Sequence, residues 1–114
     1  MKITVRRGEI QKQRADALVV NLFAGTTPSG ATAAVDRALE GQISAAINLG
    51  DFSGSSGETL LLYTKGAIAS PRVLVVGLGA RESFDLEASR RAAAQAVNAL
   101  EDTGCTRIAS IPVS

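Results

Sequence analysis

Five runs of apolar residues along the chain predict β-strands. Residues 2–6 alternate polar and apolar side chains, which is typical of a half-buried strand near a sheet edge. Residues 17–23 and 72–78 are almost continuously apolar, and such runs predict strands that are covered on both faces. Residues 59–64 and 108–112 predict two further strands.

Three segments repeat apolar residues with the period of a helix. The first follows the loop 25–30, is interrupted by Gly41, and is followed by a shorter helix that stops near Gly50. The clearest helix spans residues 86–102, with Ser83 or Asp85 as its N-cap. The apolar stripe of this helix is expected to consist of Leu86, Ala93, Val97 and Leu100.

These elements follow one another as strand, strand, helix, helix, strand, strand, helix, strand. This order predicts an α/β fold with a mixed sheet. Residues 65–71 are too few for a parallel crossover, so the two strands that they join are expected to be antiparallel neighbours or to lie apart in the sheet. The sequence contains neither an internal repeat nor a linker, so residues 1–114 are expected to form a single domain.

The composition limits which partners the protein can bind and where in the cell it is expected. The 114 residues are 46% hydrophobic and 4% aromatic, and 12 basic against 11 acidic residues leave a net charge of +1. A charge so close to zero argues against nucleic acid and anionic lipid as partners. The N-terminus is too polar for a signal peptide, and every apolar run is shorter than a membrane span, so we expect a cytoplasmic protein.

Several catalytic chemistries are excluded by the residue types that are missing. The chain has no histidine, which excludes Ser-His-Asp and Cys-His catalysis and HExxH zinc sites. Its one cysteine, Cys105, forms neither an intrachain disulfide nor a multi-cysteine zinc site, and it is expected to be a buried spectator. The carboxylates are scattered at loops and helix ends, where solvated caps explain most of them.

Glycine-rich segments offer imperfect phosphate-binding loops. Residues 25–32 nearly match the P-loop pattern, but Ala31 stands where the lysine is required, which argues against a nucleotide hydrolase. Gly77 and Gly79 follow a strand as a dinucleotide loop would, but Glu82 stands where the third glycine is required. A tight turn at the strand exit is therefore the preferred interpretation of this second segment.

The opening of the chain resembles that of a macro domain. The resemblance rests on residues 3–5, 8–10 and 16–20, and it continues in the small-residue helix 30–35 and the strand 73–77. It implies a ligand site whose candidate residues here are Glu9, Ile10, Gly30, Ala31, Gly77 and Gly79. However, Glu9 stands for the aspartate that meets adenine in that family, and Val20 and Phe23 stand for two asparagines. These departures argue against binding or hydrolysis of ADP-ribose.

A closer resemblance covers nearly the whole chain. Its most specific blocks are Leu-Gly-Asp-Phe-x-Gly at residues 49–54, Gly-Glu-Thr at 57–59 and Val-Gly-Leu-Gly at 76–79. Further matching blocks lie at 15–20 and 36–41. In this order and spacing they resemble the N-terminal domain of leucyl (cytosol) aminopeptidases. That domain has a macro-like fold, so the resemblance implies a three-layer structure that lacks the family's last helix and strand.

The resemblance also implies a function for a longer protein. In this family a C-terminal catalytic domain holds two divalent ions, Zn²⁺ or Mn²⁺, and its signature Asn-Thr-Asp-Ala-Glu-Gly-Arg-Leu is absent from residues 1–114. The chain is therefore expected to be a non-catalytic module of a cytoplasmic aminopeptidase, with the catalytic domain and a hexamer of the same protein as its partners. Its expected role is in assembly and at the rim of the active-site chamber.

Two alternatives stay open. The first is a stand-alone macro-like domain that binds an ADP-ribose-like nucleotide. The second is a regulatory nucleic-acid-binding role, against which the net charge and the few aromatic residues argue. If the last helix and strand are missing, strand 2–6 is expected either to close onto strand 107–111 or to pair with a second copy.

Overall fold

The computed structural model describes residues 2–5, 12 and 14–113, and these form an α/β fold with a mixed sheet, as the sequence predicts. Residues 81–83 add a short 3₁₀ turn. The helices and strands occur in the expected order: β1 (Lys2–Val5), β2 (Ala17–Leu22), α1 (Gly30–Ala38), α2 (Gln42–Asn48), β3 (Thr59–Tyr63), β4 (Arg72–Gly77), α3 (Leu86–Leu100) and β5 (Arg107–Ser110).

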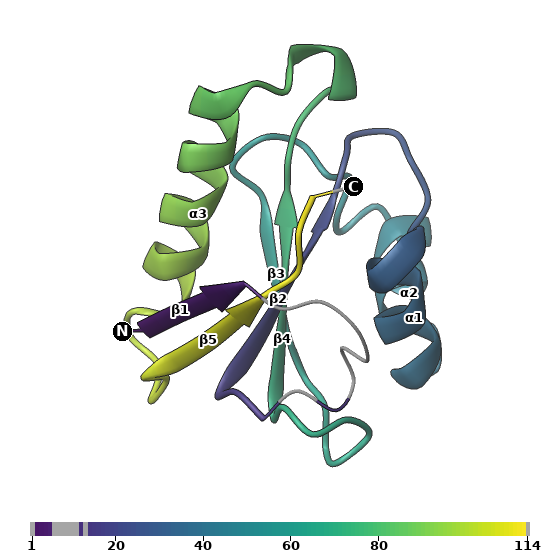
Figure 1. The fold of residues 1–114 in the computed structure, drawn as a ribbon. Helices are drawn as coiled ribbons and strands as arrows, with labels where there is room; N and C mark the ends of the chain where they lie inside the picture. The colour runs from purple at the N-terminus through teal and green to yellow at the C-terminus, as the bar shows by residue number, and fades with distance from the viewer. Residues whose placement is uncertain (1, 6–11, 13, 114) are drawn as a thin grey trace.

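The strands of the described residues form one sheet in the order β1-β5-β2-β4-β3. Strand β3 is antiparallel to β4, which confirms the expectation from their short connection, and the other neighbouring pairs are parallel. Helix α3 lies on one face of the sheet, and α1 and α2 lie on the other (Figure 1). The molecule therefore has three layers.

The central strands are buried on both faces because each layer of helices covers one of them. The even-numbered residues Leu18 and Val20 of β2 pack toward α1 and α2, in a cluster that also contains Phe52. Ala17 and Val19 pack toward α3 together with Leu100. This alternation explains why the run 17–23 shows no polar face in the sequence.

The apolar stripe of α3 differs from the predicted one. Leu86 is 69% exposed, and the buried residues are Ala88, Ala96 and Leu100. Asp85 caps the helix by accepting a hydrogen bond from the backbone N–H of Ala88 at 2.8 Å, which fixes where the helix begins. The prediction for Leu100 is confirmed, but in so alanine-rich a helix the remaining small side chains give too little contrast to predict which of them face the sheet.

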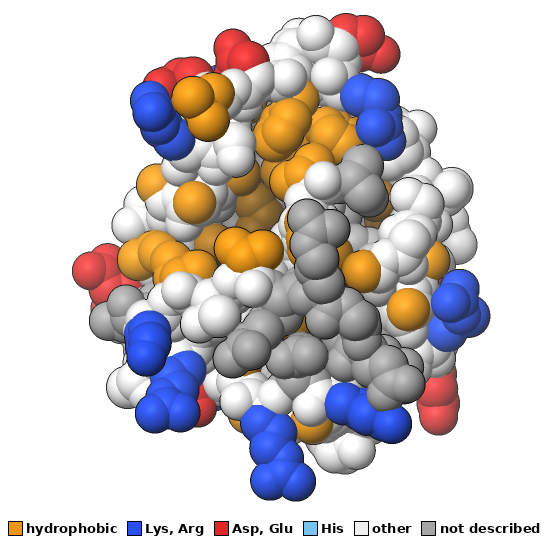
Figure 2. Space-filling view, viewed as in Figure 1, with side chains coloured by type: hydrophobic (Ala, Val, Ile, Leu, Met, Phe, Trp, Pro, Cys, Tyr) orange, Lys and Arg blue, Asp and Glu red, His pale blue; other side chains and the backbone are white. Residues whose placement is uncertain are grey.

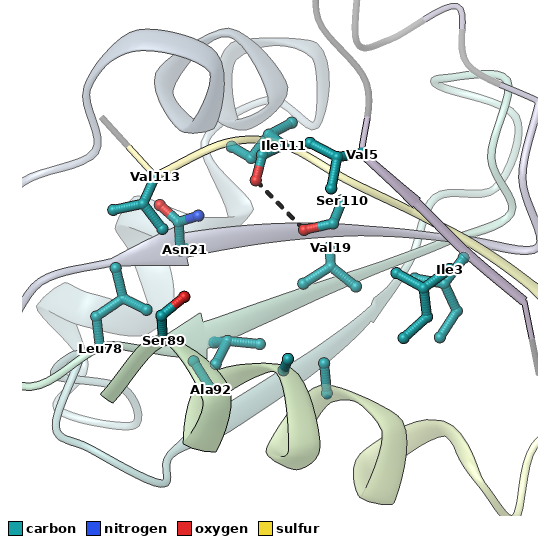
Figure 3. A pocket seen from close by; sticks show the side chains of 14 residues that line it. Ile3, Val5, Val19, Asn21, Leu78, Ser89, Ala92, Ser110, Ile111 and Val113 are labelled. Carbon is teal, nitrogen blue, oxygen red and sulfur yellow. Dashed lines mark hydrogen bonds between the residues drawn. The ribbon is translucent and has the colours of Figure 1, made fainter. Parts of the chain in front are cut away.

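Strand β1 lies at the sheet edge as predicted, but its apolar residues are more exposed than a half-buried strand requires. Ile3 is 46% exposed and Val5 is 64% exposed. Both line a groove of about 260 Å³ between the sheet and α3. Figure 2 shows this groove as a hollow among hydrophobic side chains, and Figure 3 shows Ile3 and Val5 across it from Ser89 and Ala92 of α3. We refer to it as the apolar groove.

The apolar groove stays open because the facing residues of α3 are small. Ser89, Ala92, Ala93 and Ala96 line the groove with only one methyl or hydroxymethyl group each, so they leave the space above β1 and β5 unfilled. Among the described residues, no helix combines the length and the apolar character needed to cross a membrane.

Candidate functional site

A small cleft lies where β2 ends and α1 begins, at the carboxyl end of parallel strands, where open α/β sheets usually bind ligands. Its volume is about 20 Å³, which is room for roughly one water molecule and far below the ~300–1,000 Å³ of typical small-molecule sites. The described residues that line it are Asn21, Leu22, Phe23, Thr26, Thr27, Ser29, Ala31, Thr32, Arg81 and Ile111.

Two of the hydroxyl groups that line this cleft donate hydrogen bonds to the backbone. Thr32 donates to the carbonyl oxygen of Asn21 at 2.9 Å, and Thr26 donates to that of Phe23 at 2.8 Å. These bonds fasten the start of α1 and the loop before it to the end of β2. They also leave fewer free donors for a ligand.

Arg81 and Phe23 line the cleft and contact each other, and the ring of Phe84 packs on that of Phe23. The guanidinium carbon of Arg81 lies 4.2 Å from the ring centroid of Phe23, a cation–π contact. The ring of Phe84 meets that of Phe23 edge-on at 5.3 Å. The side chain of Arg81 is thereby held beside the cleft, where it is the positive group that an anionic ligand would meet.

The structure separates the candidate residues taken from the sequence. Gly30, with a φ of +55°, begins α1, and Ala31 lines the cleft. Gly77 and Gly79 face the loop 54–56 instead. Glu9 and Ile10 lie outside the described residues.

Gly77 and Gly79 form a strand-exit turn against that loop. A Cβ atom on Gly77 would lie 2.2 Å from the carbonyl oxygen of Ser55, so a larger residue does not fit. The backbone N–H of Gly79 donates to the carbonyl of Gly54 at 2.9 Å, and that of Gly77 donates to the carbonyl of Glu58 at 2.8 Å. The segments 49–58 and 76–79 therefore pack against each other.

Glu58 organises the loop that receives these glycines. Its Oε1 accepts hydrogen bonds from the Ser53 hydroxyl at 2.8 Å and from the backbone N–H groups of Ser53 and Ser55 at 3.0 and 2.9 Å. These bonds lower the pKa of the Glu58 carboxyl below its usual value, and the bond from the Ser53 hydroxyl has the largest effect. The loop is thus ordered by its own side chains.

Other carboxylates also serve the fold. Asp16 accepts from the backbone N–H groups of Thr106 and Arg107, both at 2.8 Å, and these bonds lower the pKa of Asp16. Asp36 accepts from the backbone N–H of Ile43 at 2.8 Å in the first turn of α2. Asp36 is only 7% exposed, so it is a buried cap and not the solvated one that the sequence predicted.

The described residues contain no group of three or more His, Cys, Asp or Glu side chains that could hold a metal ion. Cys105 is buried, as expected. Sequence reasoning missed Arg81 and its contact with Phe23. The available signal was a basic residue two positions after the strand-exit glycine Gly79, at the sheet edge where α/β folds bind ligands.

Comparison with known families adds a decisive observation. The model of the cytosol aminopeptidase family, N-terminal domain, matches residues 19–112, which is most of the chain. This chain belongs to the cytosol aminopeptidase family. It corresponds to the N-terminal domain, as the sequence blocks at 49–54 and 76–79 predicted.

Curated relatives support the same assignment. A probable cytosol aminopeptidase of Methylobacillus flagellatus is 37% identical over 99% of this chain, and one of Colwellia psychrerythraea is 36% identical over 91% of it. The alignments cover only 24% and 21% of these two relatives. This chain thus spans about a quarter of the length of the family members that it matches.

Solved structures show the same fold at low sequence identity. Tomato leucine aminopeptidase matches 100% of this chain and 23% of its own with a TM-score of 0.72 and 20% identity. The macrodomain of Mycobacterium tuberculosis DarG matches 97% of this chain and 76% of its own with a TM-score of 0.75 and 14% identity. The aminopeptidase N-terminal domain therefore has a macrodomain-like fold, as the sequence predicted.

Proposed function

We propose that this chain is the non-catalytic N-terminal domain of a cytoplasmic, metal-dependent leucyl aminopeptidase, a single unit over residues 1–114. In the proposal, the longer protein removes N-terminal amino acids from peptides, and its C-terminal domain holds two divalent ions, Zn²⁺ or Mn²⁺. Such ions polarise the peptide carbonyl and supply the attacking water. Membership of the family and the quarter-length match to its relatives support this proposal.

We propose that the domain has two roles, which are to assemble a homo-oligomer and to form the rim of the active-site chamber. The family resemblance implies that this homo-oligomer is a hexamer. The apolar groove carries this proposal. Its rim includes Ile3, Val5 and Val113, which are 46%, 64% and 40% exposed. Apolar surface of this kind, next to the β1 edge that no other described strand covers, is typical of a surface that is covered in an assembly.

A chimaera tests this role in a working enzyme. Residues 1–114 would replace the matching N-terminal part of the Methylobacillus flagellatus relative, and the same part would be deleted in a second variant. We expect the chimaera to keep the mass and kcat/KM of its parent, and the deletion to lose oligomeric mass. A deletion variant with unchanged mass by light scattering and unchanged kcat/KM would contradict the proposed role.

The isolated chain is expected to hydrolyse no aminoacyl substrate when Mn²⁺ or Zn²⁺ is supplied. The reason is that its described residues offer no cluster of metal ligands. The measurement is release of p-nitroaniline from leucine p-nitroanilide, with the complete Methylobacillus flagellatus relative as the positive control. Metal-dependent turnover that co-elutes with the pure chain on a sizing column would overturn this expectation.

The isolated chain is also expected to self-associate at high concentration. Strand β1 pairs with β5 on one side, and no other described strand pairs with its outer edge in the order β1-β5-β2-β4-β3. A second copy can pair there and cover Ile3 and Val5. Light scattering across a concentration series should show mass rising toward a dimer, and Val5→Lys should reduce it. A strict monomer at all concentrations would refute this prediction.

The alternative function is binding of an ADP-ribose-like nucleotide at the cleft, and two observations favour it as a second candidate. The fold matches that of a macrodomain, and the guanidinium of Arg81 stands beside the N-terminus of α1. Against it stand the volume of about 20 Å³ and the complete burial of Val20.

ADP-ribose is accordingly expected to bind weakly or not at all. Val20 and Phe23 offer no polar group to a ribose or an adenine, and a ligand whose polar groups stay unpaired loses affinity. Calorimetry with ADP-ribose should show no saturable heat at micromolar concentrations. Micromolar affinity that falls in Arg81→Gln would place the nucleotide at the cleft and reverse the order of the two functions.

A further inference from the structure

A second hollow lies at the β1 end of the sheet, on the face opposite the apolar groove. Its volume is about 300 Å³. Side chains alternate along a strand, so Lys2 and Thr4 of β1 face this hollow while Ile3 and Val5 face the apolar groove. We refer to it as the basic hollow. Its described lining consists of Lys2, Thr4, Arg14, Ala15, Arg107, Ile108 and Ala109.

Three cationic side chains converge on the basic hollow from three segments that are distant in sequence. Lys2 comes from β1, Arg107 from β5, and Arg14 from the residues before β2. Figure 2 shows Lys and Arg side chains gathered at the lower left, over the start of β1 and β5. Because β5 lies between β1 and β2, the three chain segments are neighbours in the sheet.

The register of the sheet places two of these charges directly opposite each other. Lys2 pairs with Arg107 in the parallel ladder between β1 and β5. Side chains at such positions have Cβ atoms roughly 5 Å apart on one face, and like charges there destabilise the pair. A bound anion between Lys2 and Arg107 would remove this repulsion.

No described carboxylate forms an ion pair with these cations. The ion pairs among the described residues join Arg90 and Arg91 to Glu87 on α3, and none involves Lys2, Arg14 or Arg107. The carboxylate next to β5 belongs to Asp16. Its Oδ2 already accepts hydrogen bonds from the backbone N–H groups of Thr106 and Arg107 and from the Thr106 hydroxyl.

We propose that the basic hollow binds a small multivalent oxyanion, a phosphate or diphosphate group, through Lys2, Arg14 and Arg107. Thr4 adds a hydroxyl on the same face of β1. Three positive charges match the two or three negative charges of such a group. Arginine forks donate two parallel hydrogen bonds to it. A hollow of about 300 Å³ lies at the lower end of the range of small-molecule sites.

Calorimetry of the full chain with sodium pyrophosphate, at constant ionic strength, tests this proposal. We expect saturable binding to the wild-type chain, and the same titration with inorganic phosphate should give weaker binding. Lys2→Gln, Arg14→Gln and Arg107→Gln should each weaken binding by about tenfold, as expected for loss of a charge-assisted hydrogen bond. Arg90→Gln, which removes the same charge from α3, is the matched control and should bind as wild type.

Folding and site location need separate readouts. Without pyrophosphate, Lys2→Gln should keep or raise the melting temperature, because it removes one member of a like-charge pair. Lys2→Arg should retain binding.

Several results would overturn the proposal. The first is an absence of saturable heat with the wild-type chain. The second is a loss of pyrophosphate affinity in Arg90→Gln as large as that in the Lys2, Arg14 and Arg107 variants. The third is a loss of affinity in Arg81→Gln with none in Arg107→Gln. Binding of a DNA duplex without binding of pyrophosphate would also contradict it. The chimaera measures assembly and activity, whereas this titration measures anion binding. A negative result with the chimaera would therefore not contradict the basic hollow, and a negative titration would not contradict the proposed function.

Discussion

The Gly77→Ala variant is expected to lose about 3 kcal/mol of unfolding free energy, the upper end of the usual cost of overpacking. The added Cβ would lie 2.2 Å from the carbonyl oxygen of Ser55 and 2.7 Å from the carbonyl carbon of Gly54. Both contacts are with backbone, which moves only if the whole loop moves. The loop is held by the hydrogen bonds to Glu58, so it cannot move away from the added methyl group without breaking some of them.

Urea unfolding followed by circular dichroism measures this loss. Gly104→Ala is the matched control, because its Cβ would meet only the Nη2 atom of Arg72 at 3.8 Å, an ordinary contact. We expect Gly104→Ala to stay within about 1 kcal/mol of wild type. Equal midpoints for the two variants would show that the loop yields and that the prediction for Gly77 is wrong.

Replacing Phe52 with alanine is expected to cost about 3–5 kcal/mol, the range for truncating a buried phenylalanine. Phe52 is 1% exposed and packs in the cluster between the sheet and helices α1 and α2. Truncation removes the ring and leaves a cavity beneath the loop that receives Gly77. Because a whole domain is stable by only about 5–15 kcal/mol, this loss is a large fraction of the total.

Leu49→Ala provides the comparison for Phe52→Ala. Leu49 belongs to the same sequence block but is 76% exposed, so its truncation should change stability by less than about 0.5 kcal/mol. Thermal and urea unfolding of both variants give the answer. If the two substitutions cost the same, Phe52 does not anchor the loop in solution.

Both predictions concern the two sequence blocks that most specifically pointed to the aminopeptidase family. Segments 49–58 and 76–79 are distant in sequence, yet the backbone N–H of Gly79 donates to the carbonyl of Gly54 and that of Gly77 to the carbonyl of Glu58. The blocks are therefore parts of one folding element. Their residue types follow from close backbone packing, and no ligand is needed to explain them.

The order and type of the elements could be predicted because their hydrophobic patterns are strong. Strand β4 is apolar from Val73 to Val76, as a strand covered by helices on both faces requires. The buried face of α3 was predicted correctly only at Leu100, because alanine gives little contrast between the faces and Leu86, an equally large apolar residue, is exposed in the first turn. The exposure of Ile3 and Val5 also depends on the size of side chains on a distant helix.

The candidate site was harder to predict than the fold for a related reason. Gly77 and Gly79 partly match a dinucleotide-binding loop in the sequence. Only the structure shows that the side on which each would carry a Cβ atom faces residues 54–56. The contact between Arg81 and Phe23 joins two strand ends that are neighbours in the sheet but far apart along the chain. Likewise, Lys2 and Arg107 are opposite each other only because β1 pairs with β5.

The position of β5 has a consequence for how the domain folds. β5 is the last of the described strands in sequence, yet it fills the gap between β1 and β2, and Asp16 reaches Arg107 across 91 residues. Contacts of such high sequence separation slow folding, because a long loop must close before they form. During synthesis β1 has no neighbour in the sheet until β5 has left the ribosome. We therefore expect the domain to complete its sheet late, with the edge of β2 open to mispairing until then.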